Sequence, residues 1–290
     1  MVKVYMMQNR KEIIEKVKKT LIEASSKFRD DQKWIYTSAI KSESNGNAKW
    51  VLENILKNAL IAEENKSPMC DDTGIPHLFI DIGPKKTLNG NLISMIYEGV
   101  REGLCELPGR PMAVIGSDIQ RIDQSEGLDS DPGALLPAPI IIRSVKENII
   151  KLHILMLGGG PAIRGKTFRI FHKHNVSVLR DEIVSWSTEA VGQLGCSPCA
   201  LAIGIGRSQS EATSLMMEAM VDSNFKTQSV LESEITNLVN ESQIGPLGLG
   251  GKTSVLATFI KVGQQRASGV RIVALRPCCC IEPRKASVLM

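Results

Sequence analysis

The chain has 290 residues, of which 43% are hydrophobic and 23% charged. This composition is typical of a protein that buries a core, and it excludes a disordered chain. A formal charge of +4 accompanies only 4% aromatic residues, so the interleaved basic and aromatic pattern of a nucleic-acid platform is missing and no nucleic-acid partner is expected. Residues 1–19 lack the apolar region of a signal peptide, and no stretch approaches the roughly 20 apolar residues that span a bilayer. The sequence predicts a cytoplasmic protein with no membrane partner.

Helical periodicity dominates the first 65 residues. Apolar residues recur every three or four positions in two stripes, at 13–22 and at 51–60. The pattern then predicts a strand at 78–82, which ends at Gly83-Pro84, and a helix at 92–107. Two β-branched runs, at 140–142 and 149–157, flank a polar segment at 146–148. This arrangement predicts a β-hairpin over 139–157.

The second half of the chain alternates helices and strands. Helices are predicted at 175–194, 210–221 and 230–239, and strands at 201–205, 254–261 and 270–275. No internal repeat and no linker divides the sequence. We therefore predict an α+β fold with a helix-rich N-terminal part and a mixed β-sheet, forming a single catalytic domain over residues 1–290.

The seven cysteines are unevenly placed. Six of them fall into three loop groups that contain glycine or proline, around Cys70, around Cys196 and Cys199, and at Cys278–Cys280. An odd number of cysteines in a reducing compartment argues against a disulfide framework and for metal binding, catalysis or simple burial. Three thiolates gathered from such loops can hold an iron–sulfur cluster that keeps one iron open to a substrate.

Each cysteine group also has a simpler interpretation. Cys70 is either a cluster ligand beside an acid/base carboxylate at Asp72, or a buried cysteine before a turn in which Asp71 or Asp72 bonds its own backbone. The C-x-x-C at Cys196 is half of a zinc site or a redox dithiol, but no second pair stands at zinc spacing. The three consecutive cysteines cannot all face one metal, because neighbours in an extended segment point in opposite directions.

Glycine-rich segments and one arginine add candidates for binding. Residues 158–160 are all glycine, which either allows a ligand to approach the backbone or makes a tight turn. Arg110 is either a bidentate carboxylate clamp or a surface residue. Gly251-Lys252-Thr253 lacks the glycine spacing of a nucleotide-binding P-loop, so nucleotide binding is not expected.

Taken together and in this order, the loops resemble the class I fumarase and tartrate dehydratase family of iron–sulfur hydro-lyases, in its N-terminal domain or α subunit. Cys70-Asp71-Asp72-Thr73-Gly74 resembles the family's Cys-Gln-Asp-Thr-Gly signature, and residues 158–160 resemble its triple-glycine loop. Gly195-Cys196-Ser197-Pro198 is similar to its Cys-Pro-Pro turn, and residues 245–253 are similar to its Gly-Pro-x-Gly-Leu-Gly-Gly-Lys-Thr segment. The resemblance covers most of the chain.

The resemblance implies a [4Fe-4S] cluster, an acid/base residue and contacts to a small carboxylic acid substrate. It implies a β subunit that supplies the rest of the active site, in a heterodimer or heterotetramer. Counting along the family pattern favours Cys279 over Cys278 and Cys280 as the third ligand, and Cys196 over Cys199 as the second. The implied residues are Cys70, Cys196 and Cys279 for the cluster, Asp72 for catalysis, and Asp71, Arg110, Gly159 and Gly160 for the substrate.

Four positions depart from the family pattern. Asp71 replaces a glutamine and brings a negative charge to the place where a dicarboxylate would sit, which disfavours a dianion unless Asp71 is protonated or paired. Met112 stands at an asparagine position, Ala267 at a histidine position and Arg207 at a glycine position. We therefore expect a substrate other than fumarate. The alternatives are a metal-binding or redox-sensing protein without catalysis, and an inactive scaffold subunit.

Overall fold

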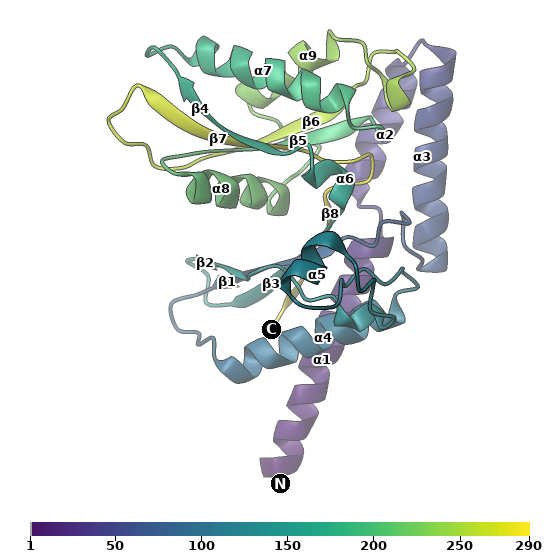
Figure 1. Ribbon diagram of the computed structural model, residues 1–290, viewed down its shortest axis with the longest axis vertical. Coiled ribbons are helices and arrows are strands. Elements are labelled where there is room, and N and C mark those ends of the chain that lie inside the picture. The colour runs from purple at the N-terminus through teal and green to yellow at the C-terminus, as the bar shows by residue number, and fades with distance from the viewer. Residues whose placement is uncertain (1) are drawn as a thin grey trace. The chain divides into compact units, whose positions relative to one another are not determined.

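The computed structural model describes residues 2–290 and contains two compact units (Figure 1). The first unit comprises residues up to Lys27, Ala62–Gly158 and Arg284–Met290, and the second comprises Phe28–Ile61 and Gly159–Pro283. Both units combine helices with a four-stranded sheet, which confirms the α+β class. That residues 1–290 act as one catalytic domain stays a prediction. Among the described residues, no helix has both the length and the apolar character needed to cross a membrane.

The sheet of the first unit has the strand order β2-β1-β3-β8. Its strands are β1 (Ile75–Ile82), β2 (Ile141–Ser144), β3 (Ile150–Leu157) and β8 (Arg284–Leu289). Helices α1 (Val2–Ser26) and α4 (Gly90–Glu106) pack together and cover one face. The core between helices and sheet includes Val17 and Leu21 of α1, Ile96 of α4, Ile80 of β1 and Leu152 of β3. The predicted strand at 78–82 and helix at 92–107 therefore lie in β1 and α4.

The predicted hairpin at 139–157 is wrong in its pairing. Strands β2 and β3 both exist, but β1 lies between them, parallel to β2 and antiparallel to β3. Segment 145–149 crosses the end of β1, where the Gly83 N–H donates to the carbonyl of Ile149 at 2.8 Å. A Cβ on Gly83 would lie 2.0 Å from the carbonyl oxygen of Glu147. Glycine at this position therefore lets the connection pass over β1, whose backbone groups then pair on both sides.

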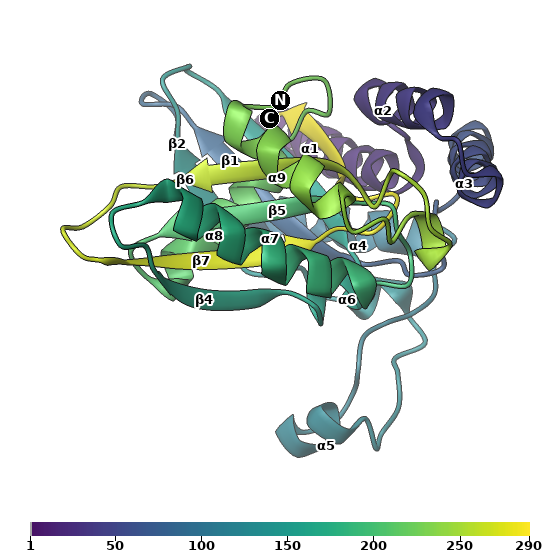
Figure 2. The same cartoon turned by 90° about the horizontal axis from the view of Figure 1, so that it is seen from above.

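The sheet of the second unit has the order β4-β7-β5-β6. Its strands are β4 (Lys166–Phe171), β5 (Cys199–Gly206), β6 (Val255–Val262) and β7 (Val270–Pro277). Helices α7 (Val176–Gly192) and α9 (Val230–Asn240) cover one face and α8 (Gln209–Val221) covers the other (Figures 1 and 2). Strand β4 was not predicted from the sequence. It is an edge strand whose residues are mostly exposed, so it carries little of the apolar signal of a buried strand.

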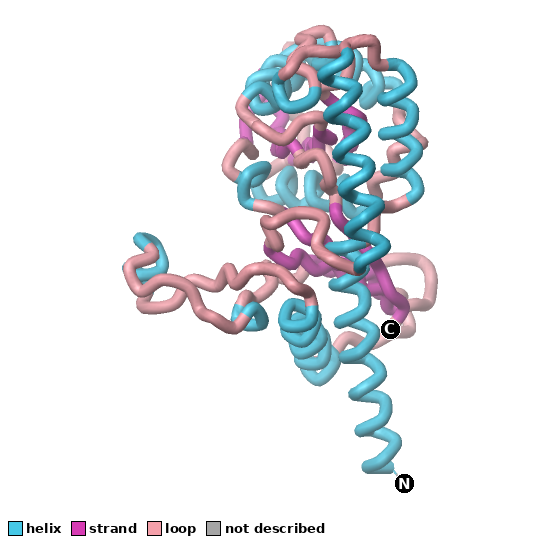
Figure 3. Tube along the Cα trace, turned by 90° about the vertical axis from the view of Figure 1, so that its right-hand side faces the viewer, coloured by secondary structure: helices cyan, strands magenta, loops and turns pink. Residues whose placement is uncertain are grey.

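The remaining helices connect or extend these units. Helix α2 (Asp30–Ser42) belongs to the second unit, α3 (Gly46–Asn65) begins there and ends in the first, and α6 (Gly159–Ala162) opens the long second-unit segment. In the first unit, α5 (Asp118–Asp123) lies at the far end of a long excursion between α4 and β2 (Figure 3). No residue of α5 is buried. The short 3-10 turns Pro132–Ala134 and Pro246–Gly248 complete the set.

Candidate active site

The first cysteine loop, Cys70–Gly74, is a turn capped by its own side chain. It follows α3 in the first unit, where a carboxylate oxygen of Asp72 accepts the Gly74 N–H at 3.0 Å. The half-buried Cys70 thiol donates to Asp71 Oδ1 at 3.5 Å. The Asp72 geometry is the self-bonded turn that was weighed as the simpler interpretation. It also holds the carboxylate in one place on the loop that carries Cys70. Its acid/base role stays a prediction.

Arg284 fixes this loop from within the same unit. Its Nη1 donates to the carbonyl oxygens of Asp72 at 2.9 Å and Thr73 at 3.2 Å, and the side chain is 2% exposed. Gly74 has a φ of +83°, and a Cβ there would lie 2.5 Å from Arg284 Nη2. The guanidinium of Arg284 therefore occupies the space that a side chain at position 74 would need. Sequence reasoning missed this role, although a charged residue that opens a strand just after a cysteine group was a visible signal.

Arg110 is joined to the same loop. The Thr73 hydroxyl accepts the Arg110 N–H at 3.0 Å and donates to the Arg110 carbonyl at 3.2 Å. The Arg110 guanidinium lies 3.7 Å from the Asp71 carboxylate, and both side chains are exposed. The structure thus brings together four predicted site residues: Cys70, Asp71, Asp72 and Arg110. The negative charge that Asp71 introduces is paired with Arg110.

In the second unit, the structure brings Cys196 and Cys279 together. A hydrogen bond between their thiols and the burial of Cys196 together raise the pKa of Cys196. Cys199 and Cys278 are fully buried instead, and burial raises the pKa of both thiols. Cys199 opens β5 and packs in the core of the second unit. Of the cysteines in these two loops, the pair in contact is therefore the one that the family pattern favoured.

A buried ion pair shapes the loop that carries Cys279. Arg276 Nη1 lies 2.7 Å from Glu282 Oε2, and Arg276 Nη2 lies 3.3 Å from Glu282 Oε1. The same carboxylate accepts the Cys279 N–H at 3.3 Å, while the Cys278 N–H donates to the carbonyl of Ala200 at 2.7 Å. Burial alone would lower the pKa of Arg276, but the charge of Glu282 raises it, so Arg276 stays charged. The loop is thus built around a bidentate charge pair.

Helix α2 holds the same loop from another side. Tyr36 donates its hydroxyl to the carbonyl of Cys280 at 2.6 Å, Gln32 donates to Ile281 at 2.9 Å, and Arg29 at the helix N-cap donates to Pro283 at 2.6 Å. Burial raises the pKa of Tyr36, and the neighbouring cysteines act in the same direction. The hydroxyl therefore keeps its proton and remains a donor. None of these three side chains was singled out from the sequence.

The glycine segments differ in how they are held. Gly159 and Gly160 are exposed at the start of α6, and a Cβ on either would meet no atom within 4 Å. Close packing therefore does not require glycine there, and their substrate contacts stay a prediction. The segment at 245–253 is tied to the Cys196 loop, because Ser197 Oγ donates to the Gly245 carbonyl at 2.7 Å and the Leu247 N–H donates to Ser197 at 3.1 Å.

A second charged cluster lies on the sheet of the first unit. Arg143 Nε and Nη2 donate to the two carboxylate oxygens of Asp81 at 2.6 and 3.0 Å, and His153 Nε2 lies 2.9 Å from Asp81 Oδ2. Burial would raise the pKa of Asp81, but the bonds from Arg143 and His153 lower it. Burial lowers the pKa of His153. The Asp81 carboxylate acts in the opposite direction, but its effect is smaller and the charge of Arg143 opposes it. The sequence analysis did not predict this cluster.

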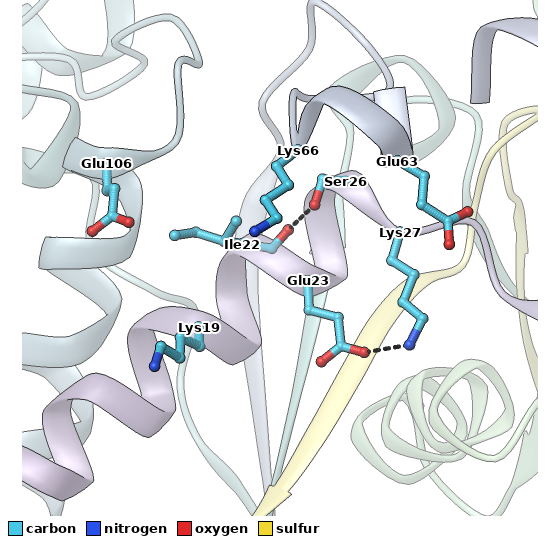
Figure 4. A pocket seen from close by; sticks show the side chains of 8 residues that line it. All are labelled: Lys19, Ile22, Glu23, Ser26, Lys27, Glu63, Lys66 and Glu106. Carbon is cyan, nitrogen blue, oxygen red and sulfur yellow. Dashed lines mark hydrogen bonds and ion pairs between the residues drawn. The ribbon is translucent and has the colours of Figure 1, made fainter. Parts of the chain in front are cut away.

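The first unit also contains a cavity of about 370 Å³ between α1, the end of α3 and α4. Figure 4 shows its charged lining, in which Lys27 pairs with Glu23 at 2.8 Å and Ser26 Oγ donates to the Ile22 carbonyl at 2.7 Å. Lys66 projects into the same space. None of the lining residues is a predicted site residue. They are Lys19, Ile22, Glu23, Ser26, Lys27, Glu63, Lys66 and Glu106.

Within the described residues of either unit, no group of three or more His, Cys, Asp or Glu side chains is placed to hold a metal ion. The donor set of the second unit is the Cys196–Cys279 pair. Cysteine thiols from separate loops are the donor type that ligates an iron–sulfur cluster, in which each cysteine would bind a different iron.

The comparison with known families decides the affiliation of the chain. The model of the family described as "Fumarate hydratase (Fumerase)" matches residues 14–288. The chain belongs to this family. It is a family of hydro-lyases, as predicted from the loops.

"Putative L(+)-tartrate dehydratase subunit alpha" of Methanocaldococcus jannaschii is 28% identical over 252 residues, covering 83% of this chain and 85% of that protein. "L(+)-tartrate dehydratase subunit alpha" of Escherichia coli K12 is 24% identical over 243 residues, covering 82% and 78%. The Shigella boydii protein of the same name has the same identity and coverage.

Proposed function

We propose that this chain is the cluster-bearing, α-type subunit of a cytoplasmic [4Fe-4S] hydro-lyase that adds or removes water on a hydroxy or unsaturated carboxylic acid. The observation that carries the proposal is the contact between the Cys196 and Cys279 thiols in a member of the fumarate hydratase family. Cys70 is the third ligand in this proposal. Its half-buried thiol sits on the loop that Arg284 and Thr73 hold in place.

Held by Cys70, Cys196 and Cys279, such a cluster would supply Lewis-acid activation of the substrate hydroxyl as a leaving group. The residues of the first unit do the remaining work in this proposal. Asp72 takes or delivers the proton on the adjacent carbon, because its carboxylate is held by the Gly74 N–H on the loop that carries Cys70. A general base works efficiently only when its carboxylate is held in a defined position relative to the proton that it removes.

Arg110 binds a carboxylate of the substrate. Its present partner, Asp71, is an exposed carboxylate at 3.7 Å, and such a pair contributes at most about 1 kcal/mol. A substrate carboxylate that binds the guanidinium in bidentate fashion can therefore replace it. Asp71 would then lie beside a dianion, which supports a preference for a substrate other than fumarate. Gly159 and Gly160 offer backbone contacts to the substrate in the same proposal.

A β subunit completes the active site. The relatives from M. jannaschii and E. coli are both named as α subunits, and they are covered over most of their length. We therefore propose a heterodimer or heterotetramer with a β-type chain. L(+)-tartrate, which is a dianion like fumarate, and a hydroxy monocarboxylic acid are the first two substrates to compare, because only the second avoids a charge beside Asp71. Efficient hydration of fumarate by the complex, at an ordinary Michaelis constant, would contradict the proposed change of substrate.

Anaerobic reconstitution with iron and sulfide tests the cofactor directly. The expected result is four irons and four sulfides per chain, with an EPR signal of a three-iron cluster after brief exposure to air. Cys279→Ser and Cys196→Ser should each abolish the cluster. Cys105→Ser is the matched control, since Cys105 lies on α4 of the first unit and bonds Asp131. Zinc, or no bound metal, in the native chain would leave a structural or redox role for the cysteines.

A further inference from the structure

The loop that carries Cys279 depends on side chains for its shape. It runs from the end of β7 at Pro277 to the start of β8 at Arg284, and the Cys279 N–H bonds the Glu282 carboxylate, which lies outside any helix or strand. A thiol on such a loop is positioned only as well as the loop itself is held. The place of Cys279 beside Cys196 is therefore set by the groups that bind the loop backbone.

Three of these groups come from the start and one face of α2. Arg29 is the N-cap residue of the helix, and Gln32 and Tyr36 are four residues apart and project from the same side of it. They donate to the carbonyls of Pro283, Ile281 and Cys280, respectively. The three donors thus contact the loop in order at positions 283, 281 and 280, and the last contact falls on the residue directly after Cys279.

Tyr36 is the most restrained of the three donors. Its side chain is 1% exposed, its ring packs against Phe28 with centroids 5.6 Å apart, and its hydroxyl bond to Cys280 is short at 2.6 Å. A tyrosine has few side-chain torsions, so a buried and packed ring holds its hydroxyl in a defined place. A long flexible side chain would fix the same carbonyl less well.

We propose that Tyr36 is a positioning residue, which holds Cys279 against Cys196 through the carbonyl of Cys280. The proposal rests on the proposed function for its biological meaning, because a fixed thiol pair favours cluster assembly and slows cluster loss. The positioning itself concerns the thiols of the chain and is measurable without a cluster.

The test uses Tyr36→Phe, which removes the hydroxyl and keeps the ring. Tyr97→Phe is the matched control, because Tyr97 is exposed on α4 in the first unit. The reduced chain without a cluster is treated anaerobically with iodoacetamide, and the alkylation rate of each cysteine is followed by mass spectrometry. The rate at Cys279 is divided by the rate at the exposed Cys105 of the same sample, so a general loss of stability is recognised.

Tyr36→Phe should raise this ratio about fivefold, which corresponds to the loss of one hydrogen bond of about 1 kcal/mol, and Tyr97→Phe should leave it unchanged. After reconstitution, Tyr36→Phe should also lose its visible cluster absorbance faster in air. Gln32→Met gives a second variant and should raise the ratio in the same direction. An unchanged ratio in both variants overturns the proposal, and so does an equal rise at every cysteine. If no cluster assembles in any variant, the proposed function fails while the alkylation ratio still decides the role of Tyr36.

Discussion

The buried pair of Arg276 and Glu282 permits a quantitative prediction of stability. Their side chains are 5% and 0% exposed, so both charges are almost fully removed from water. Glu282→Gln keeps the shape of the side chain and removes only its charge, which leaves the Arg276 charge buried without compensation. Breaking a buried pair by removal of one partner costs about 3–5 kcal/mol. Glutamine retains an acceptor for Arg276 and for the Cys279 N–H, so we expect about 3 kcal/mol.

The assay is urea unfolding of the reduced chain without a cluster, followed by far-UV circular dichroism and tryptophan fluorescence. If the units unfold separately, the transition of the second unit should shift. Glu211→Gln is the matched control, because the Arg207–Glu211 pair is largely exposed and should cost no more than about 1 kcal/mol. Arg276→Met combined with Glu282→Gln should regain at least half of the loss, because no buried charge then remains unpaired.

Equal costs for Glu282→Gln and Glu211→Gln would refute this reasoning, because they would mean that water or another group compensates Arg276. A double variant less stable than Glu282→Gln alone would refute it in a second way. The methionine would then cost more through packing than the uncompensated charge costs through desolvation.

Three further predictions follow from the first unit. The pKa values of His153 and Asp81 are both lowered in the folded chain, so the unfolded chain binds protons first. The free energy of unfolding should therefore fall as the pH drops, below about 6.5 because of His153 and below about 4 because of Asp81. His153→Gln should reduce the pH dependence of the urea midpoint between pH 7 and 5, and an unchanged dependence would exclude His153 as its source. Asp72→Asn keeps an acceptor for the Gly74 N–H, so it should retain four irons per chain and reduce turnover at least about 100-fold; loss of iron would make the role of Asp72 structural. Gly74→Ala meets Arg284 and a φ of +83°, so thermal unfolding should show a loss of about 2 kcal/mol or more, whereas a neutral result would mean that the guanidinium moves aside.

Local sequence patterns predicted those parts of the fold that depend on periodic burial. Helix α4 and strand β1 were found because their apolar residues face one continuous core. The hairpin failed because the sequence shows that 140–142 and 149–157 are strands but not that β1 enters between them. That insertion depends on Gly83 and the backbone of Glu147, which are distant along the chain.

The candidate site was likewise predicted only in part. The resemblance to a family singled out Cys196 and Cys279, and the structure brings these two thiols into contact. The residues that hold the loops were missed. Tyr36 and Arg284 bond backbone groups more than 200 residues away, and Glu282 bonds the Cys279 N–H inside a loop with no regular structure. Such bonds follow no period and no spacing rule. They are visible only when the fold has brought donor and acceptor together.

The passage of the chain between its two units also constrains the order in which they are made. Residues 28–61 of the second unit are synthesised before most of the first, and the first unit lacks β8 until residues 284–289 have left the ribosome. Arg284, which binds the Cys70 loop, arrives with that strand. Neither unit corresponds to one continuous stretch of the gene, so simple truncation cannot isolate either of them. The Cys70 loop therefore lacks its Arg284 contacts until the last residues of the chain have been synthesised, and it reaches its final form only at the end of translation.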